Sequence, residues 1–347
     1  MKAYSDAVKR RIKMMLNSPD WGERFYNEHG SAFFNQMIST LTETSQYPLD
    51  KLPVKEDSQS RWLAYFHFDY QTGKKEFAFN KRKILSEEGT SLSGHDANRE
   101  RQLNAIFQLM VTCCHEFRHY EQSYIESVKN METLDPMAIL FAKEAILLRE
   151  DNEFYKKNHD SFVIEMDAMA KAFGEINGIL SSMDYKTKDM ERIIRNCDSY
   201  MASYNKQIAD YKKRGGFVEE ISTRFDHIMK TMSPSKRSMY MARMPILTLV
   251  YNQDGSKKTY REIMGQKNKF IQAKRNMPNS QDSMDSFMSH LDSVYSTIID
   301  CDRSLRKQKD DDYQSKEIKR DPYGISYADI EREKKKIESS KGVGHSR

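Results

Sequence analysis

The feature that most constrains the fold is an uninterrupted segment, 96–127, that contains neither proline nor glycine. Its apolar residues recur at steps of three and four, as they do along one face of an α-helix. Asp96 or Asn98 can cap the start of this helix. We therefore expect one long helix, and its apolar content indicates that it is buried. The periodic positions are Leu103, Ile106, Met110, Cys113 or Cys114, Phe117 and Tyr124.

Two histidines stand four residues apart in this segment, His115 and His119, and Glu116 follows the first. Positions i and i+4 lie on one face of a helix, so both imidazoles can reach one metal ion. Glu116 would lie beside that ion as a candidate general base. The alternative is a pair of histidines that contact nearby acids in an ordinary helix. The helical context favours the metal site.

At His115, Glu116 and His119 the chain resembles the zincin metallopeptidases, and the resemblance covers at most about 61–174. It implies a Zn²⁺ ion, a bound water and hydrolysis of a peptide bond in a protein or peptide substrate. In the expected mechanism the ion lowers the pKa of its water toward about 7. Glu116 takes the proton of that water and later returns it to the leaving amine.

A third protein ligand is expected, because catalytic zinc usually has three plus water. No histidine follows at the metzincin spacing, so we predict Glu165, on a helix that begins near residue 161. A carboxylate in this otherwise apolar segment needs a partner, and the alanines that follow allow two helices to approach closely. Glu-Met-Asp-Ala at this point resembles a sequence of several gluzincin-like families, although the commoner pattern has Asp where Met169 stands. The alternative is an ordinary surface acid, and the other candidate ligands, expected to be solvated, are Glu144, Glu150 and Glu153.

Several neighbouring side chains are candidates for supporting roles. Asp167 could accept the second N–H of a zinc-bound histidine. Arg118 is expected to pair with an acid such as Glu121, with orientation of a substrate carboxylate as the alternative. Tyr120 and Tyr155 are candidates for stabilising an oxyanion. The remaining histidines lack ligand spacing; they are His29, His67, His95, His159, His227, His290 and His345.

We expect an α+β fold that is mostly α, with a zincin-like catalytic core. A β-hairpin should precede the long helix, with strands at 62–70 and 76–80 around a turn at 71–75. The zincin resemblance implies that the edge strand pairs with an extended substrate. The expected divisions are N-terminal helices over the core (1–55), the catalytic core (56–182), a helical region (183–305) and a charged mobile tail (306–347).

Heptad-like apolar spacing marks three later segments, 190–211, 218–232 and 284–298. Their stripes should pack together as a helical bundle, onto a second copy of the chain, or onto a helical partner that contacts 190–232 and 284–298. Between them, Ile246–Tyr251 reads as a strand, with a turn at Asp254 and Gly255. A solvated helix is expected at 327–339.

Composition limits the function classes. The net charge of +5 comes from 56 basic and 51 acidic residues, so a nucleic-acid partner is disfavoured. The four cysteines form no CxxC motif and are expected to be free buried thiols. The N-terminus lacks an apolar signal region, and charges interrupt the most apolar helix, 137–148, so we expect a cytoplasmic protein without a membrane span. The rival to the peptidase is a non-enzymatic scaffold protein with coiled-coil-like helices and a structural or vestigial zinc site.

Overall fold

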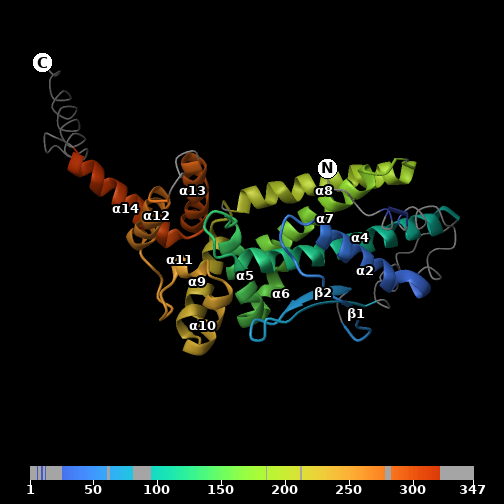
Figure 1. Ribbon diagram of the computed structural model, residues 1–347, viewed down its shortest axis with the longest axis horizontal. Coiled ribbons are helices and arrows are strands. Elements are labelled where there is room, and N and C mark those ends of the chain that lie inside the picture. The colour runs from blue at the N-terminus through green and yellow to red at the C-terminus, as the bar shows by residue number, and fades with distance from the viewer. Residues whose placement is uncertain are drawn as a thin grey trace, which may run out of the picture.

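The computed structural model describes residues 26–60, 63–80, 95–184, 186–211, 213–277 and 283–320, together with four positions near the N-terminus. These residues form a mostly helical α+β fold with one small sheet, in agreement with the predicted class (Figure 1). Most of the first predicted helix, the loop at 89–94 and the helix at 327–339 lie outside the described residues.

The sheet has the strand order β1-β3-β2, with β1 at Val54–Glu56, β2 at Ala64–Phe68 and β3 at Lys75–Phe79. β2 and β3 form the predicted antiparallel hairpin. Its turn includes Gly73 with a φ of 77°, a conformation that favours glycine. β1 pairs in parallel with β3 and was not predicted. β2 is therefore an edge strand, and it packs along the long helix.

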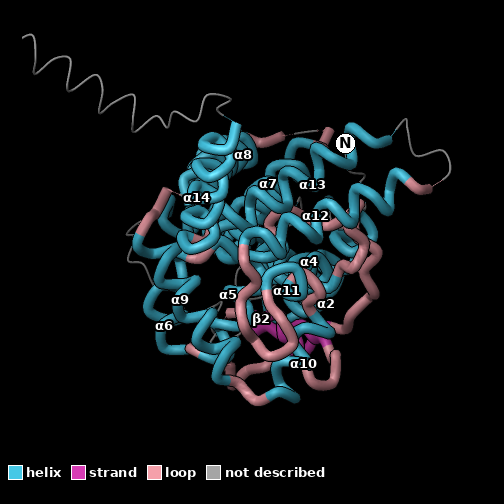
Figure 2. Tube along the Cα trace, turned by 90° about the vertical axis from the view of Figure 1, so that its left-hand side faces the viewer, coloured by secondary structure: helices cyan, strands magenta, loops and turns pink. Residues whose placement is uncertain are grey.

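That long helix, α4, spans His95–Ser127 as predicted. It packs mainly against α7 (Val163–Ser181), against β2 and against α2 (Tyr26–Thr44). Figure 1 shows α4 and α7 in the middle of the molecule, with the sheet on one side and α8 (Lys188–Tyr211) on the other. In Figure 2 the strands lie below α4. The two central helices thus hold the elements of the expected catalytic core together.

Two apolar cores lie along this pair of helices. One core contains the buried residues of α2, the sheet, the middle of α4, the end of α7 and the start of α8. The other contains the end of α4, the start of α7, and buried residues of α5 (Ala138–Glu150), α9 (Gly216–Thr231) and α13 (Met284–Asp300). α4 and α7 contribute to both cores, and so connect them.

The three heptad segments are helices, as predicted: α8, α9 and α13. Each packs mainly on another helix, although buried residues of α9 and α13 share one apolar core. α8 packs along α7, α9 packs on α5, and α13 packs on α12 (Tyr260–Arg275) and α14 (Arg303–Arg320). Their apolar residues are covered largely within the chain, including Met190, Cys197, Phe225 and Leu291.

One prediction for the C-terminal part is wrong. Residues 247–250 form a short helix, α11 (Leu247–Val250), and not a strand; only the following Tyr251 forms an isolated bridge, with Lys257. The predicted turn nearby does occur, with Gly255 at a φ of 83°. The first part of the expected tail is helical, since α14 runs to Arg320.

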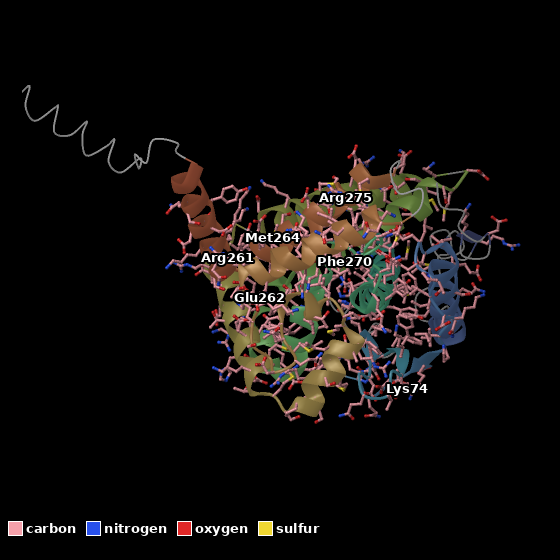
Figure 3. The ribbon with its side chains drawn as sticks, turned by 60° about the vertical axis from the view of Figure 1, so that its left-hand side comes forward. Lys74, Arg261, Glu262, Met264, Phe270 and Arg275 are labelled. Carbon is pink, nitrogen blue, oxygen red and sulfur yellow. The ribbon has the colours of Figure 1, made fainter. Side chains whose placement is uncertain are left out.

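The remaining helices are short. α6 spans Asn152–Asn158, the 3₁₀ turn η2 spans His159–Ser161, and α10 spans Pro234–Arg243. Figure 3 shows residues of α12 from Arg261 to Arg275 on one side of the molecule, well apart from Lys74 at the hairpin turn. All four cysteines are buried and none of them forms a disulfide, as predicted. Among the described helices, none has the length and apolar character needed to span a bilayer.

Candidate metal centre

The predicted ligands come together. The Nε2 atoms of His115 and His119 are 3.0 Å apart, and Oε2 of Glu165 lies 3.2 Å from the first and 3.5 Å from the second. Their ligand atoms all lie within 4.8 Å of one another. Donors at 2.0–2.1 Å from a tetrahedral zinc would be about 3.3 Å apart. Oε2 of Glu165 is buried and has no hydrogen-bond partner among the described residues. The donor set and its spacing therefore fit a zinc ion.

Glu165 is in position because of how α7 begins. Phe162, the residue before α7, provides no side-chain cap. The cap comes from Glu144 on α5, whose carboxylate accepts hydrogen bonds from the backbone N–H groups of Val163 (3.1 Å) and Ile164 (2.7 Å). An acid at a helix N-terminus accepts hydrogen bonds from the free backbone N–H groups, and the positive end of the helix dipole stabilises its negative charge. This contact fixes the first turn of α7, from which Glu165 projects.

The three alternative ligands lie elsewhere. Glu144 is fully buried, so the expectation that it is solvated is wrong. Burial raises the pKa of Glu144 to about 7, although the hydrogen bonds from α7 and Tyr211 act to lower it. Glu150 accepts hydrogen bonds from Lys236 and Tyr240. Glu153 is exposed, as expected. None of the three belongs to the ligand cluster found among the described residues.

The second oxygen of Glu165 is also held. Tyr155 Oη on α6 donates a hydrogen bond to Oε1 at 2.5 Å. Burial alone would raise the pKa of Glu165, but the two histidines outweigh burial and hold that pKa well below its ordinary value. Burial likewise would lower the pKa of His119, and the Glu165 carboxylate instead raises it to about 9. Even without a metal ion, the carboxylate of Glu165 and the histidines therefore stabilise each other's charged forms.

A glutamine that the sequence analysis did not consider orients His119. Gln122 Nε2 donates hydrogen bonds to Ile164 O (2.8 Å) and Asp167 Oδ2 (2.7 Å), which leaves its Oε1 to accept from His119 Nδ1 at 2.8 Å. A proton on Nδ1 leaves Nε2 free as a ligand. The only signal in the sequence was a glutamine three residues after the second histidine.

Asp167 therefore supports the centre one step further away than expected. It accepts hydrogen bonds from Gln122 and from Arg118, and among the residues with described side chains no histidine donates to it. Arg118 also pairs with Glu121 at 2.9 Å, which is the structural pairing that was favoured. The guanidinium is buried between these acids, which raise its pKa although burial opposes them. Arg118 is thus committed to joining α4 and α7.

Glu116 lies beside the cluster and is anchored by the edge strand. Its Oε2 accepts a hydrogen bond from the backbone N–H of Phe66 on β2 at 2.7 Å. Burial raises the pKa of Glu116, while the histidines and the Phe66 N–H act in the opposite direction. A carboxylate with a raised pKa is better able to hold a proton, as a general base must.

The tyrosine hydroxyls considered for an oxyanion are engaged elsewhere. Tyr120 Oη donates to the backbone oxygen of Asp50 at 3.0 Å, and Tyr155 Oη donates to Glu165. His159, which the sequence analysis set aside, has its Nε2 atom 3.4 Å from Glu165 Oε2 and a side chain that is 45% exposed. It reaches the centre through the fold of η2, and no spacing in the sequence marks it.

Two openings flank the cluster. A cavity of about 90 Å³ includes His119 and Glu165 in its walls. A larger groove of about 550 Å³ includes His115, Glu116 and His159. β2 contributes to both, with Ala64 in the groove and Phe66 in the cavity. The cluster is therefore accessible from two sides along one edge strand.

Comparisons of the chain with protein-family models, with curated proteins and with solved structures found no match.

Proposed function

We propose that the protein is a zinc-dependent peptidase in which His115, His119 and Glu165 hold the metal and Glu116 is the general base. The observation that carries the proposal is the convergence of these three ligand atoms, within 4.8 Å, on a helix pair beside an anchored glutamate. When bound, zinc would supply Lewis acidity and make a water molecule acidic near neutral pH.

Each residue around the site has its own role in the proposed reaction. Oε2 of Glu116 is fixed by Phe66, so Oε1 is the oxygen that accepts a proton from the attacking water and passes it to the leaving amine. Gln122 accepts a hydrogen bond from His119 Nδ1 and would so leave Nε2 available to a metal ion. Tyr155 restrains the Glu165 carboxylate. The edge of β2 and the two openings provide a path for an extended peptide.

Access distinguishes this proposal from the scaffold alternative. Structural zinc sites usually have four protein ligands and are closed, whereas catalytic sites keep a position for water. Here three ligands cluster among the described residues, and they line a cavity on one side and a groove on the other. A site of this kind suits catalysis better than cross-linking.

The test is Glu116→Gln, which keeps size and removes basicity. We expect zinc content and thermal stability close to wild type, and cleavage of a peptide library lower by about 10²-fold or more. Glu153→Gln is the matched control, because its side chain is exposed on α6, and it should cleave as wild type does. His115→Ala should lose zinc.

Two results would count against the proposal. If Glu116→Gln cleaves as fast as wild type, the assigned general base is wrong. If the zinc-loaded protein cleaves no member of the library and no protein in a mixed lysate, the scaffold alternative is favoured.

A further inference from the structure

The smaller cavity, of about 90 Å³, resembles a pocket for a substrate side chain. One wall is aromatic, formed by Phe66, Phe68 and Tyr70 on and after β2. α5 and the start of α7 also contribute to the lining. His119 and Glu165 are part of this lining, and the scissile peptide bond would lie beside them in the proposed reaction. A substrate side chain next to that bond could therefore enter it.

A stripe along α4 connects His119 to a buried acid in the lining of the same cavity. His119, Ser123 and Glu126 all line the cavity, and they occupy positions i, i+4 and i+7 of one helix face. Ser123 is small and leaves room between the other two. Seven residues of helix correspond to about 10.5 Å at 1.5 Å per residue. Only a long side chain would reach the carboxylate from the metal end.

Glu126 is buried without a cation in direct contact. Its Oε2 accepts a hydrogen bond from Tyr70 Oη at 2.8 Å, and Oε1 accepts none from the residues that the structure describes. It belongs to no ion pair within 4.0 Å in that same part of the chain. Burial raises the pKa of Glu126 to about 7, although the hydrogen bond from Tyr70 and the nearby cations act to lower it. A buried carboxylate of this kind gains from an incoming positive charge.

Three cationic groups act on Glu126 from nearby, namely His119 of the cluster, Arg149 and Lys75, and the last two make other contacts. Arg149 donates hydrogen bonds to Phe68 O (2.6 Å) and Ala145 O (3.1 Å), with its guanidinium 4.3 Å from the Tyr70 ring centre. Lys75 Nζ lies 5.0 Å from the ring centres of Phe68 and Tyr120. Arg149 is thus part of the wall, and neither Arg149 nor Lys75 lies against the carboxylate of Glu126.

We propose that this cavity selects substrates with a lysine or arginine next to the scissile bond, its apolar stem between the aromatic wall and α5 and its charge at Glu126. This inference rests on the proposed peptidase function. The walls suit the stem, because long basic side chains bury their methylene groups along apolar surface while the charged end finds polar partners. A short or acidic side chain would leave Glu126 buried and unpaired.

The first experiment measures kcat/KM for peptides that differ only at the two residues flanking the cleaved bond. Wild type should prefer lysine or arginine over norleucine or glutamate at one of these positions by at least about tenfold. Glu126→Gln keeps an acceptor for Tyr70 and should lose that preference, so that its kcat/KM values for the lysine, arginine and norleucine peptides become similar to one another. Glu132→Gln, a partly exposed glutamate that pairs with Lys274, is the matched control.

A second experiment needs no cleavage. Binding of Nα-acetyl-lysine amide and Nα-acetyl-norleucine amide is compared by NMR titration of the zinc-loaded protein. The two probes share one stem length and differ in charge. The lysine probe should bind at least about tenfold more tightly to wild type and equally with norleucine to Glu126→Gln. Ser123→Leu, which fills the cavity beside Glu126, should weaken both.

The outcomes separate the two proposals. Cleavage without a basic preference, or a preference for acidic residues, overturns the pocket assignment and leaves the peptidase. A lysine-selective binding signal without any cleavage overturns the peptidase and supports the pocket. Equal binding of both probes to wild type overturns the pocket assignment even if every peptide resists cleavage.

Discussion

Gln122 offers the sharpest test of how the proposed centre is held, because its side chain joins a proposed ligand on α4 to the helix that carries the proposed third ligand. It is fully buried, and its amide makes three hydrogen bonds, to His119 Nδ1, Ile164 O and Asp167 Oδ2. Gln122→Met keeps the approximate volume and removes all three. His119 then loses the acceptor that fixes its ring.

The magnitudes follow from these contacts. Loss of a hydrogen bond to a metal-binding histidine typically weakens metal affinity 10- to 100-fold, which is about 1.4–2.8 kcal/mol. In metal-free protein, three buried hydrogen bonds at about 1 kcal/mol each predict a decrease of about 3 kcal/mol in the free energy of unfolding. The loss of zinc affinity and the loss of free energy of unfolding in metal-free protein are independent quantities, so they are measured separately.

The assays are zinc competition against a fluorescent chelator and denaturant unfolding in the presence of excess chelator. Gln108→Met is the matched control, since Gln108 is an exposed glutamine on the same helix. It should change neither quantity by more than experimental error. Zinc affinity of Gln122→Met within twofold of wild type would refute the orienting role, and an equal loss in Gln108→Met would show that the effect is not specific to the contact.

Three further predictions concern buried groups. Burial raises the pKa of Glu126 and Glu144 from 4.5 to about 7. The folded state therefore holds these protons more tightly than the unfolded chain. Their contribution to the free energy of unfolding should fall as pH rises from 4.5 to 7, by about 3 kcal/mol for each residue at about 1.36 kcal/mol per pKa unit, as denaturant titrations at several pH values would reveal. Tyr155→Phe removes the hydroxyl that restrains Glu165 and should weaken zinc affinity about tenfold in the same chelator assay, with little loss of fold by circular dichroism. Gly255→Ala should lower the melting temperature by several degrees in calorimetry, since its φ is 83° and a Cβ would lie 2.2 Å from a backbone oxygen of α9.

Local patterns predicted the centre because its main parts lie on regular elements. The histidine spacing has meaning only on a helix, and the lack of proline and glycine in 96–127 indicated one. Glu165 could be found because a carboxylate among apolar residues and alanines needs a partner across the helix pair. The hairpin could be found because its strands are rich in aromatics and a glycine turn separates them.

The supporting residues could not be found in this way, because they act across the fold. Glu144 caps a helix that starts 19 residues later, and a glutamate on an apolar helix does not indicate which N–H groups it will meet. His159 approaches Glu165 through a 3₁₀ turn. The role of Gln122 depends on where α7 places Ile164 and Asp167.

The strand wrongly predicted in the C-terminal region and the helix not foreseen there also have physical causes. An apolar run as short as 246–251 fits either a buried strand or a single buried helical turn, and packing decides between them. α14 lacks an apolar period, but its start is anchored by the buried side chain of Leu305, and Asp312 further along accepts a hydrogen bond from Arg261 on α12. Charged sequence alone did not show these contacts.

The division of the apolar interior into two cores would give a zinc ion bound at the proposed site a thermodynamic role beyond chemistry. His115 lies where α4 passes through one core, and Glu165 lies on the first turn of α7, which belongs to the other. Unfolding of the part of the chain around either core would separate the proposed ligands. An ion bound to all three would therefore link the stabilities of the two cores. Zinc at 100 times its Kd would add about 2.7 kcal/mol to the free energy of unfolding of the whole. By reciprocity, a substitution that loosens α13, far from the centre, would appear in a titration as weaker binding of zinc.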